Sequence, residues 1–440
     1  MKTPVVYVFL ATAVAGAQPP KLEISLKRAV EIATSANGNA RIQLSAESLK
    51  QAEMRSGQAK AALLPNVDGS VSYQSLTRNL QAFGLNVQFP IPGFQIPAFV
   101  GPFNVFDARF TAAQSLLDMS AIRRFQASRG GIRSAREDQD AAADLVASLT
   151  AKAYLSALRA RADIDVVRAN IELASAVVKQ AENLKAAGTG TGIEITRARV
   201  QLANERQRLI AAENDLRRAQ LQLVRALNVD LGTDVELTDT LVYHPVDTET
   251  IGKALPLALE TRPDFKAQLR REDTARLSAS AVKYERLPSV AAFGDYGSIG
   301  TAVNHSLPTR AVGVAVKVPI FDGGRRDSRH GESASLHRQE QIRSRDLKEQ
   351  IRLEVQLAVD GLRSADEQVK VAAEGLKLSE SELAQARRRY DAGVANSLEV
   401  TDAQTRLARA RDNHVVALYA HEAARIDFGH ATGLLRRLID

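Results

Sequence analysis

The side chains that could do chemistry are few in this sequence, and they are poorly grouped. The 440-residue chain has no cysteine, which excludes disulfides, thiolate catalysis and cysteine-ligated metals. His414 and His421 stand seven residues apart, a spacing that suits a pair of metal ligands or a pH switch. His330 and His337 have the same spacing and read as surface residues. Because a metal usually needs three or four converging ligands, we expect no metal and place His414 and His421 at the interface of a hollow tube.

Enzymatic and nucleic-acid functions find no support either. Gly323 and Gly324 lie between a predicted strand and a predicted helix, but they lack the full glycine pattern and the lysine of a phosphate-binding loop. No serine–histidine–aspartate or zinc-protease spacing rises above chance. The formal net charge is +7, yet basic residues alternate with acidic ones along helical stretches, for example over 325–354, with no aromatic residues interleaved. We therefore expect a non-enzyme without a cofactor and without a nucleic-acid partner.

The N-terminus predicts export from the cytoplasm. Residues 1–17 have the features of a secretory signal peptide, which are a basic Lys2, a short apolar stretch over 5–14 and a small-x-small pattern at 15–17. The apolar stretch is too short to span a bilayer. The expected mature chain starts at Gln18.

Very long helices are the main predicted elements. Proline is absent between Pro102 and Pro245 and again after Pro319, so the strongest helix breaker is missing from both stretches. Apolar and small residues recur there at heptad spacing, which predicts helix packed on helix. One such seam runs from Ile195 to Leu223 in steps of seven, and the other comprises Val355, Ala358, Leu362, Ala365, Val369, Ala372, Leu376, Ser379, Leu383, Ala386 and Tyr390. The stretch 120–187 alone would make a helix on the order of 100 Å long.

The sequence also contains two copies of one plan. Ala187-Gly188 matches Ala392-Gly393, and Ile195-Thr196 matches Val400-Thr401, at an offset of 205. We expect a first repeat over 18–230 and a second over 231–440, intertwined in one unit. Each would hold a helix, a β-hairpin and a long coiled helical hairpin. The first copy carries about 19 extra residues in 77–103, predicted as an extended loop.

The predicted hairpins have one apolar and one polar or small face. Val67, Val71 and Tyr73 alternate with polar residues in the first copy, and valines alternate with small residues over 311–318 in the second. Runs of about 9–11 residues suit tilted membrane strands, although a small soluble sheet with one wet face has the same pattern. Four strands are too few to close a membrane barrel, whereas three chains would supply twelve.

Several motifs, in order and in both copies, resemble the TolC-like outer-membrane efflux protein family. They are Ile24–Ala33 at the first helix, Leu64-Pro65 and Leu287-Pro288, Arg262-Pro263-Asp264-Phe265, Val318–Arg325, and Arg389-Tyr390-Asp391-Ala392-Gly393. The resemblance covers essentially the whole mature chain. It implies a mainly α fold with a small β part. Three chains would form a twelve-stranded transmembrane β-barrel and a long α-helical barrel.

The resemblance further implies a homotrimeric channel of the bacterial outer membrane that extends into the periplasm. Such channels serve efflux and secretion together with an inner-membrane pump and a periplasmic adaptor, and they contact outer-membrane lipid. Two other readings stay open, a periplasmic adaptor and a soluble coiled-coil scaffold.

Site residues follow from the resemblance position by position. The periplasmic gate, an acidic ring, corresponds to Glu399 and Asp402, with Tyr390 tying the closed hairpins together. The alternative is that Glu399 and Asp402 are ordinary surface acids. Adaptor docking maps to the hairpin tips, namely Gly188, Thr189, Gly190, Gly393, Val394 and Ala395, and the helix–strand junctions map to Pro65, Pro288 and Pro319.

Two departures from the family pattern stand out. The first strand-to-helix crossing, Gln114–Asp118, lacks the proline that Pro319 supplies in the second. An arginine expected near Ala395 is missing, so the network that closes the gate must differ here.

Overall fold

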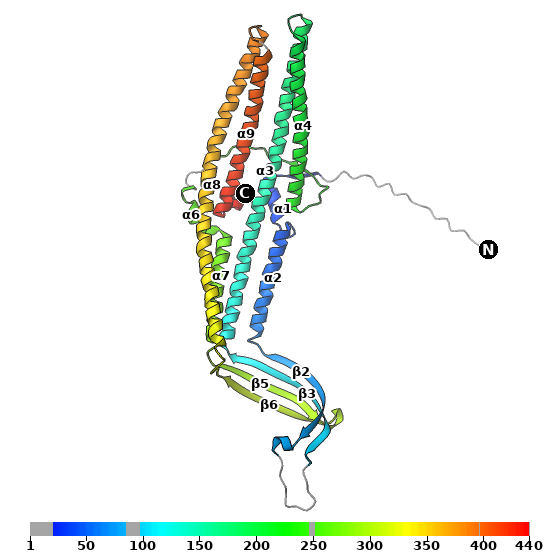
Figure 1. Cartoon of the computed structure of the whole chain (residues 1–440), viewed down its shortest axis with the longest axis vertical. Coiled ribbons are helices and arrows are strands. Elements are labelled where there is room, and N and C mark those ends of the chain that lie inside the picture. The colour runs from blue at the N-terminus through cyan, green and yellow to red at the C-terminus, as the bar shows by residue number, and fades with distance from the viewer. Residues whose placement is uncertain (1–20, 85–96, 246–250, 396, 440) are drawn as a thin grey trace, which may run out of the picture. The chain divides into compact units, whose positions relative to one another are not determined.

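The computed structural model describes residues 21–84, 97–245, 251–395 and 397–439 (Figure 1). The predicted signal peptide, residues 1–17, lies outside the described residues. The chain divides into two compact units, and each draws segments from both predicted repeats. Unit 1 comprises Met1–Ala46, Asp138–Asp264 and Lys348–Asp440, and unit 2 comprises Glu47–Glu137 and Phe265–Leu347. Within the described ranges, no helix combines the length and the apolar character needed to cross a lipid bilayer.

Unit 2 contains a four-stranded antiparallel sheet in the order β2-β3-β5-β6. Its strands are β2 (Asn66–Asn79), β3 (Phe99–Leu117), β5 (Ser289–Gly300) and β6 (Ser306–Lys317). Short 3-10 turns follow β2 at Gln81–Phe83 and precede β6 at Val303–His305. The strands are longer than the predicted 9–11 residues. β2 and β3 extend into the segment 77–103 that was predicted as a loop, because their ladder continues past a bulge at Leu76/Arg78. Residues 85–96 of that segment lie outside the described residues.

The sheet has the two faces that the sequence predicts. The register aligns Val67 with Ala112, Gly294 and Val312, so these side chains share one face. On that face the exposed apolar side chains are Val67, Val71, Tyr73, Phe110, Tyr296, Val312, Val314 and Val316. Arg310 is its one basic member. The other face carries Asp68, Thr111 and Lys317, and an ion-pair cluster in which Arg109 contacts Asp107 at 2.9 Å and Asp295 at 3.3 Å.

Helices of moderate length lead into this sheet. α2 (Ala40–Ala61) precedes β2, and α7 (Pro263–Tyr284) precedes β5. The first part of α3 (Met119–Ala186) packs between them in unit 2. Its Ser128 hydroxyl donates to that of Ser56 on α2 at 3.1 Å, and a Cβ on its Gly130 would collide with Thr274 of α7. The small residues therefore let the helices approach closely.

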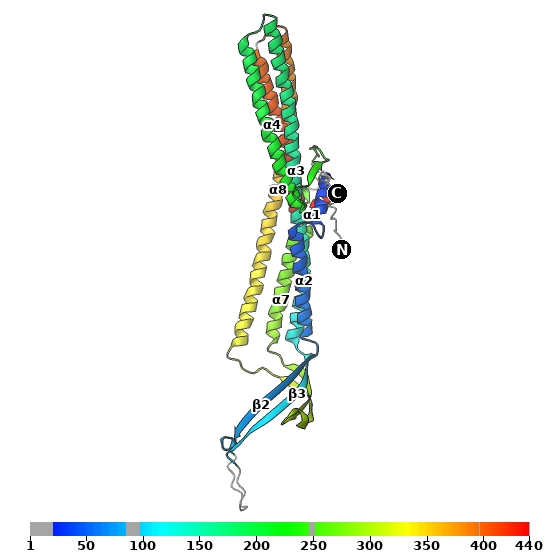
Figure 2. The ribbon, with the colours of Figure 1, turned by 90° about the vertical axis from the view of Figure 1, so that its right-hand side faces the viewer.

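Two long helical hairpins dominate unit 1 (Figure 2). The first consists of α3 (Met119–Ala186) and α4 (Gly192–Leu227), and the second of α8 (Arg325–Asp391) and α9 (Ser397–Thr432). The 68-residue α3 confirms the predicted helix over 120–187. Every residue of the predicted α8 seam is buried or half-buried, which confirms its heptad register. Near the tips, Val177, Ala198, Leu383 and Val400 pack in one cluster, so all four helices meet there.

A small layer that the sequence did not predict completes unit 1. β1 (Lys21–Ile24) pairs in parallel with β4 (Asp234–Leu237), although 209 residues separate them in sequence. Two short helices, α1 (Leu26–Thr34) and α10 (Leu435–Ile439), share the core with this pair, and a third, α6 (Ala254–Thr261), packs against α9. The main core of the unit gathers here around the fully buried Tyr154 of α3.

Candidate functional site

Both hairpin tips turn through the same glycine-dependent motif. Gly188 and Gly393 have φ angles of 80° and 73°, in the left-handed region that disfavours residues with a Cβ. The following amide reaches back five residues in each tip, Thr189 to the Leu184 carbonyl and Val394 to the Arg389 carbonyl, at 3.0 Å. These are Schellman-type helix ends, so the tips of the two hairpins have equivalent backbone turns. Gly188, Thr189, Gly393 and Val394 are exposed, whereas Gly190 and Ala395 are half-buried.

The acidic pair lies in the first turns of α9. Glu399 is half-exposed and Asp402 is exposed, while Val400 and Ala403 between and beside them are buried in the tip cluster. Glu399 Oε1 accepts a hydrogen bond from Arg389 Nε at 2.9 Å across the turn. Arg389 thus provides a basic partner close to where the expected arginine near Ala395 is missing. The sequence contained a sign of this partner, because Arg389 is the first residue of the Arg389-Tyr390-Asp391-Ala392-Gly393 motif at this tip.

Tyr390 connects the two hairpins at the same level. It is half-buried against the tip cluster, and burial, followed by the charges of Glu194 and Asp391, raises the pKa of its phenol. Glu194 caps α4 by accepting the amide of Thr191 at 2.9 Å. That bond, together with side-chain bonds from Thr191 and Ser397, keeps the pKa of Glu194 below its usual value. Since Ser397 begins α9, the Glu194 side chain bridges both hairpins, a role that sequence reasoning missed.

The helix–strand junctions contain the three predicted prolines. Pro65 separates α2 from β2, Pro288 separates α7 from β5, and Pro319 follows β6. Proline cannot continue a helix or donate to a strand ladder, so it marks each of these changes of direction. At the first crossing, which lacks proline, β3 ends at Leu117 and α3 begins two residues later.

Equivalent aspartates start the two long helices after these crossings. The Asp118 carboxylate accepts the amide of Ala121 at 2.9 Å. The Asp322 carboxylate accepts the amide of Arg326 at 3.2 Å and its Nε at 2.7 Å. The hydrogen bond from the Arg326 side chain keeps the pKa of Asp322 below its usual value. Asp118 and Asp322 therefore share an N-capping role at the starts of the two long helices.

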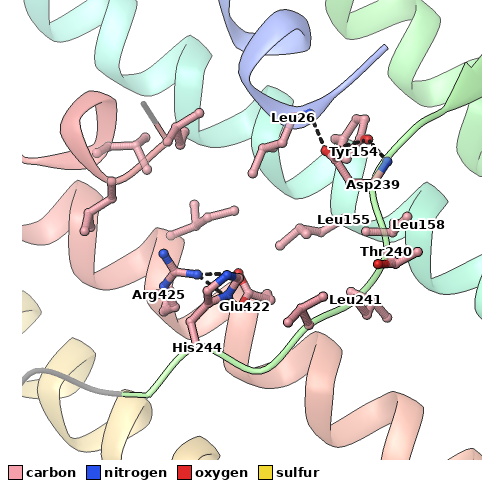
Figure 3. Close-up of a pocket in the computed structure, with 15 residues that line it drawn as sticks. Leu26, Tyr154, Leu155, Leu158, Asp239, Thr240, Leu241, His244, Glu422 and Arg425 are labelled. Atoms are coloured by element: carbon pink, nitrogen blue, oxygen red, sulfur yellow. Dashed lines mark hydrogen bonds and ion pairs between the residues drawn. The ribbon is translucent and has the colours of Figure 1, made fainter. Parts of the chain in front are cut away.

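An extended segment after β4, residues 238–245, forms a strap that ties the first hairpin to the second (Figure 3). At its first end, Asp239 Oδ2 accepts the hydroxyl of Tyr154 on α3 at 2.8 Å and the amide of Leu26 at 2.7 Å. Arg161 of α3 also donates to the carbonyls of Leu237 and Asp239. The strap therefore starts firmly bound to the first hairpin.

The second end of the strap binds the second hairpin. Tyr243 donates to Asp366 Oδ1 of α8 at 2.6 Å, and His244 Nδ1 lies 2.8 Å from Glu422 Oε1 of α9. Arg425 donates to both oxygens of Glu422 at 2.9 and 3.1 Å. Between the two ends lies a cavity of about 230 Å³ with mainly leucine and isoleucine walls and the His244–Glu422–Arg425 group at its edge (Figure 3).

The two predicted interfacial histidines differ in their surroundings. His414 is half-buried. His421 has no exposed surface, and the ring of Tyr243 from the strap packs against its ring, with the two ring centroids 5.1 Å apart. In the part of the chain that the structure describes, no three histidine, aspartate or glutamate residues converge as a metal site would require.

Comparisons with known proteins agree on one family. The family model described as outer membrane efflux protein matches residues 32–229 and 254–434. The pyoverdine export outer membrane protein OpmQ of Pseudomonas putida is 23% identical over 393 residues, which are 88% of this chain and 81% of that protein. OpmQ of Pseudomonas aeruginosa is 27% identical over 298 residues, 64% of this chain and 60% of that protein.

Solved structures show the same fold. The outer membrane protein VceC of Vibrio cholerae superposes with a TM-score of 0.78 at 18% identity, covering 93% of this chain and 96% of that one. The outer membrane channel CmeC of Campylobacter jejuni gives 0.77 at 18% identity, covering 93% and 86%. Both likenesses extend over nearly the whole chain, the strands as well as the hairpins.

Proposed function

The chain belongs to the outer membrane efflux protein family, and from this premise we infer that it is a channel of the bacterial outer membrane. It is a conduit without enzymatic chemistry and works as a homotrimer. It extends into the periplasm and acts in a tripartite export system with a periplasmic adaptor and an inner-membrane pump. The family that matches is one of outer membrane efflux proteins, so the match supports neither a periplasmic adaptor nor a soluble scaffold.

The two-faced sheet is the observation that supports the membrane location most directly. On its apolar face Val67, Val71 and Val312 are 63%, 75% and 90% exposed in the single chain. Leaving such side chains in water costs about 1.5–3 kcal/mol each relative to burial. Lipid on this face removes that cost, while the Arg109 cluster on the opposite face needs water or further polar partners.

The repeats support an arrangement in which both copies contribute equally. The order α2, β2, β3, α3, α4 recurs as α7, β5, β6, α8, α9. We propose that residues 18–230 and 231–440 are the two repeats and that three chains supply twelve strands to one membrane-embedded sheet. The antiparallel pairing of β3 with β5 joins the two copies within one chain.

The tips are the proposed gate and docking site. In a trimer Glu399 and Asp402 place six carboxylates around the periplasmic mouth, which attracts cations. Arg389 neutralises part of that charge, and Tyr390 packs the hairpins together beneath it. The exposed turns at Gly188-Thr189-Gly190 and Gly393-Val394-Ala395 are the proposed contacts for the adaptor, and Pro65, Pro288 and Pro319 direct the chain between helix and strand.

Conductance across a planar lipid bilayer tests the channel. Detergent-purified protein should give discrete steps that prefer cations. Protein that stays in solution without detergent and gives no steps would contradict the channel. Since both curated relatives are named for pyoverdine export, pyoverdine is the first cargo to test in an export assay.

A further inference from the structure

The four-stranded sheet of unit 2 has two open edges, one along β2 and one along β6 (Figure 1). Among the described residues, β2 pairs only with β3 and β6 pairs only with β5. The backbone N–H and C=O groups on the outer sides of β2 and β6 therefore have no ladder partner within one chain. Such groups must be paired inside a lipid bilayer, because no water is present there to replace the missing hydrogen bonds.

The strand directions allow a second copy of the chain to supply the missing partner. Neighbouring strands of the sheet run in opposite directions, so β6 also runs opposite to β2. A copy that places its β2 beside β6 therefore continues the same antiparallel order. The helices next to these two strands, α2 and α8, also expose large apolar side chains, namely Met54, Leu336 and Ile342, which a neighbouring chain would cover.

The two β-hairpins of the chain have the same internal register. Asn66 pairs with Ala113 in the first hairpin, and Ser289 pairs with Lys317 in the second. The offset is thus 223 residues from β2 to β5 and 204 residues from β3 to β6. The same two offsets separate the two Leu-Pro junctions and the two capping aspartates. Each residue of the first hairpin therefore has a defined counterpart in the second.

The ladder between the two hairpins predicts the ladder between two chains. Within one chain, β3 of the first hairpin pairs with β5 of the second, and Thr111 lies opposite Asp295. A pair between β6 of one chain and β2 of the next joins two hairpins in the same way, the last strand of one to the first strand of the other. The offsets convert Thr111 and Asp295 into Ala315 of β6 and Ser72 of β2.

We propose that β6 of one chain pairs with β2 of the neighbouring chain in an antiparallel ladder that sets Ala315 opposite Ser72 of that chain. This inference rests on the proposed trimeric channel, and it adds which strands meet and in which register. The register keeps the two faces of the sheet continuous from chain to chain. A shift by one residue would instead place the apolar face of one chain beside the polar face of the next.

The side chains that meet in this register are compatible. On the apolar face, Val314 lies opposite Tyr73 of the neighbouring chain, and both are largely exposed in a single chain. On the polar face, Lys317 lies opposite Ser70 and diagonally across from Asp68, within reach of a long side chain. Among the described residues, neither Lys317 nor Asp68 forms an ion pair within its own chain. The two opposite charges therefore remain available to each other across the interface.

Disulfide trapping in the full-length protein tests the register. The chain has no cysteine, so every cross-link must come from an introduced pair. Residues directly opposite on neighbouring antiparallel strands lie about 4.5–5.5 Å apart, which a disulfide can bridge, whereas diagonal neighbours lie about 7–8 Å apart. After oxidation of outer membranes, Ala315→Cys with Ser72→Cys should give covalent dimers and trimers on non-reducing gels, and a reducing agent should return them to monomers.

Ala315→Cys with Ser70→Cys is the matched control. It replaces the same type of residue two positions away on the same face of β2, and it should give several-fold less cross-linked product. Equal or stronger cross-linking in this control would overturn the register. An absence of cross-links in both pairs, in protein that still conducts and forms heat-resistant trimers, would overturn the pairing of β6 with β2 and leave the channel intact. Native protein without trimers and without conductance would overturn the proposed function together with the pairing.

A charge exchange decides the matter if the cysteine variants do not assemble. Lys317→Asp places an acid beside Asp68 of the neighbouring chain and should lower the yield of heat-resistant trimers several-fold. Adding Asp68→Lys restores an opposite pair and should recover most of that yield. A double variant that assembles no better than Lys317→Asp alone would contradict the proposed register.

Discussion

At the scale of single residues, the proposed gate depends on the charges near the hairpin tips. Glu399 shares its charge with Arg389, while Asp402 faces solvent. The two acids therefore differ in how much of their field reaches an ion in the mouth.

Removing the pair should weaken cation preference. In Glu399→Gln with Asp402→Asn, three chains lose six negative charges at the mouth, so we expect the reversal potential in a salt gradient to move toward zero. Single-channel recordings in planar bilayers measure this. Glu380→Gln, an exposed acid elsewhere on α8, is the control. Unchanged ion selectivity in the double variant would mean that Glu399 and Asp402 are ordinary surface acids.

Removing the basic partner should have the opposite effect. Arg389→Met leaves Glu399 without its 2.9 Å ion pair and makes the mouth more negative. We expect a stronger cation preference that fades as salt is raised, because exposed charges are screened over about 10 Å at 0.1 M. The same recordings at two salt concentrations check the sign. A shift in the direction of the Glu399→Gln variant would show that Arg389 acts by positioning alone.

At the scale of elements, a few residues with special backbone roles stabilise the helix ends. Gly188 and Gly393 occupy equivalent left-handed positions, and Asp118 and Asp322 cap the two longest helices. The interior of α8, by contrast, does not require its glycines, since a Cβ at Gly361 or Gly375 would meet nothing within 4 Å. Stability changes should therefore concentrate at the ends.

Alanine at the tip glycines should loosen the turns. A residue with a Cβ in the left-handed region costs about 1–2 kcal/mol, so Gly188→Ala and Gly393→Ala should speed hydrogen exchange at their own tips. Gly375→Ala is the matched control. It should be neutral or stabilising by up to about 1 kcal/mol, because alanine is the better helix former. Equal effects of all three substitutions would show that the turns do not require glycine.

Loss of the N-caps should affect the starts of the long helices. Asp118→Ala and Asp322→Ala each remove a carboxylate that accepts a first-turn amide, at a cost of about 1 kcal/mol. Exchange of the first turn of α3 or α8 should rise while the tips stay protected. Asp118→Asn and Asp322→Asn keep an accepting oxygen and should recover most of the loss. If the alanine and asparagine variants behave alike, the caps contribute little.

At the scale of the whole molecule, assembly depends on which solvent meets each face of the sheet. Among the described residues of one chain, the valines of β6 stay largely exposed, and the polar face holds the Arg109 cluster. Lipid and neighbouring chains must cover what a single chain leaves open. Neighbouring residues on one strand should therefore respond very differently to the same substitution.

Val312 and Ala311 provide this comparison. Val312→Arg puts a charge on the apolar face at a cost of about 2–4 kcal/mol near the middle of a bilayer. Ala311→Arg puts it on the polar face opposite Asp295 and should be tolerated. Heat-resistant trimers extracted from outer membranes, separated on gels, measure the yield. Equal yields would mean that this face of the sheet does not meet lipid.

The sequence by itself determined the long helices, their seams and the two-faced strands. These features depend on local periodicity and on where proline and glycine are absent, which one-dimensional patterns record directly. Only the tertiary structure decided the β1–β4 pair, the strap and the burial of His421, because each depends on contacts between residues far apart in sequence. Tyr154 meets Asp239, and Tyr243 covers His421. No periodic pattern encodes such contacts, since a single hydrogen bond or ring stack leaves no repeat in the sequence. The geometry of the hairpin tips was predictable in part. The sequence showed the glycines of the turns, but only the folded turn brings Arg389 to Glu399.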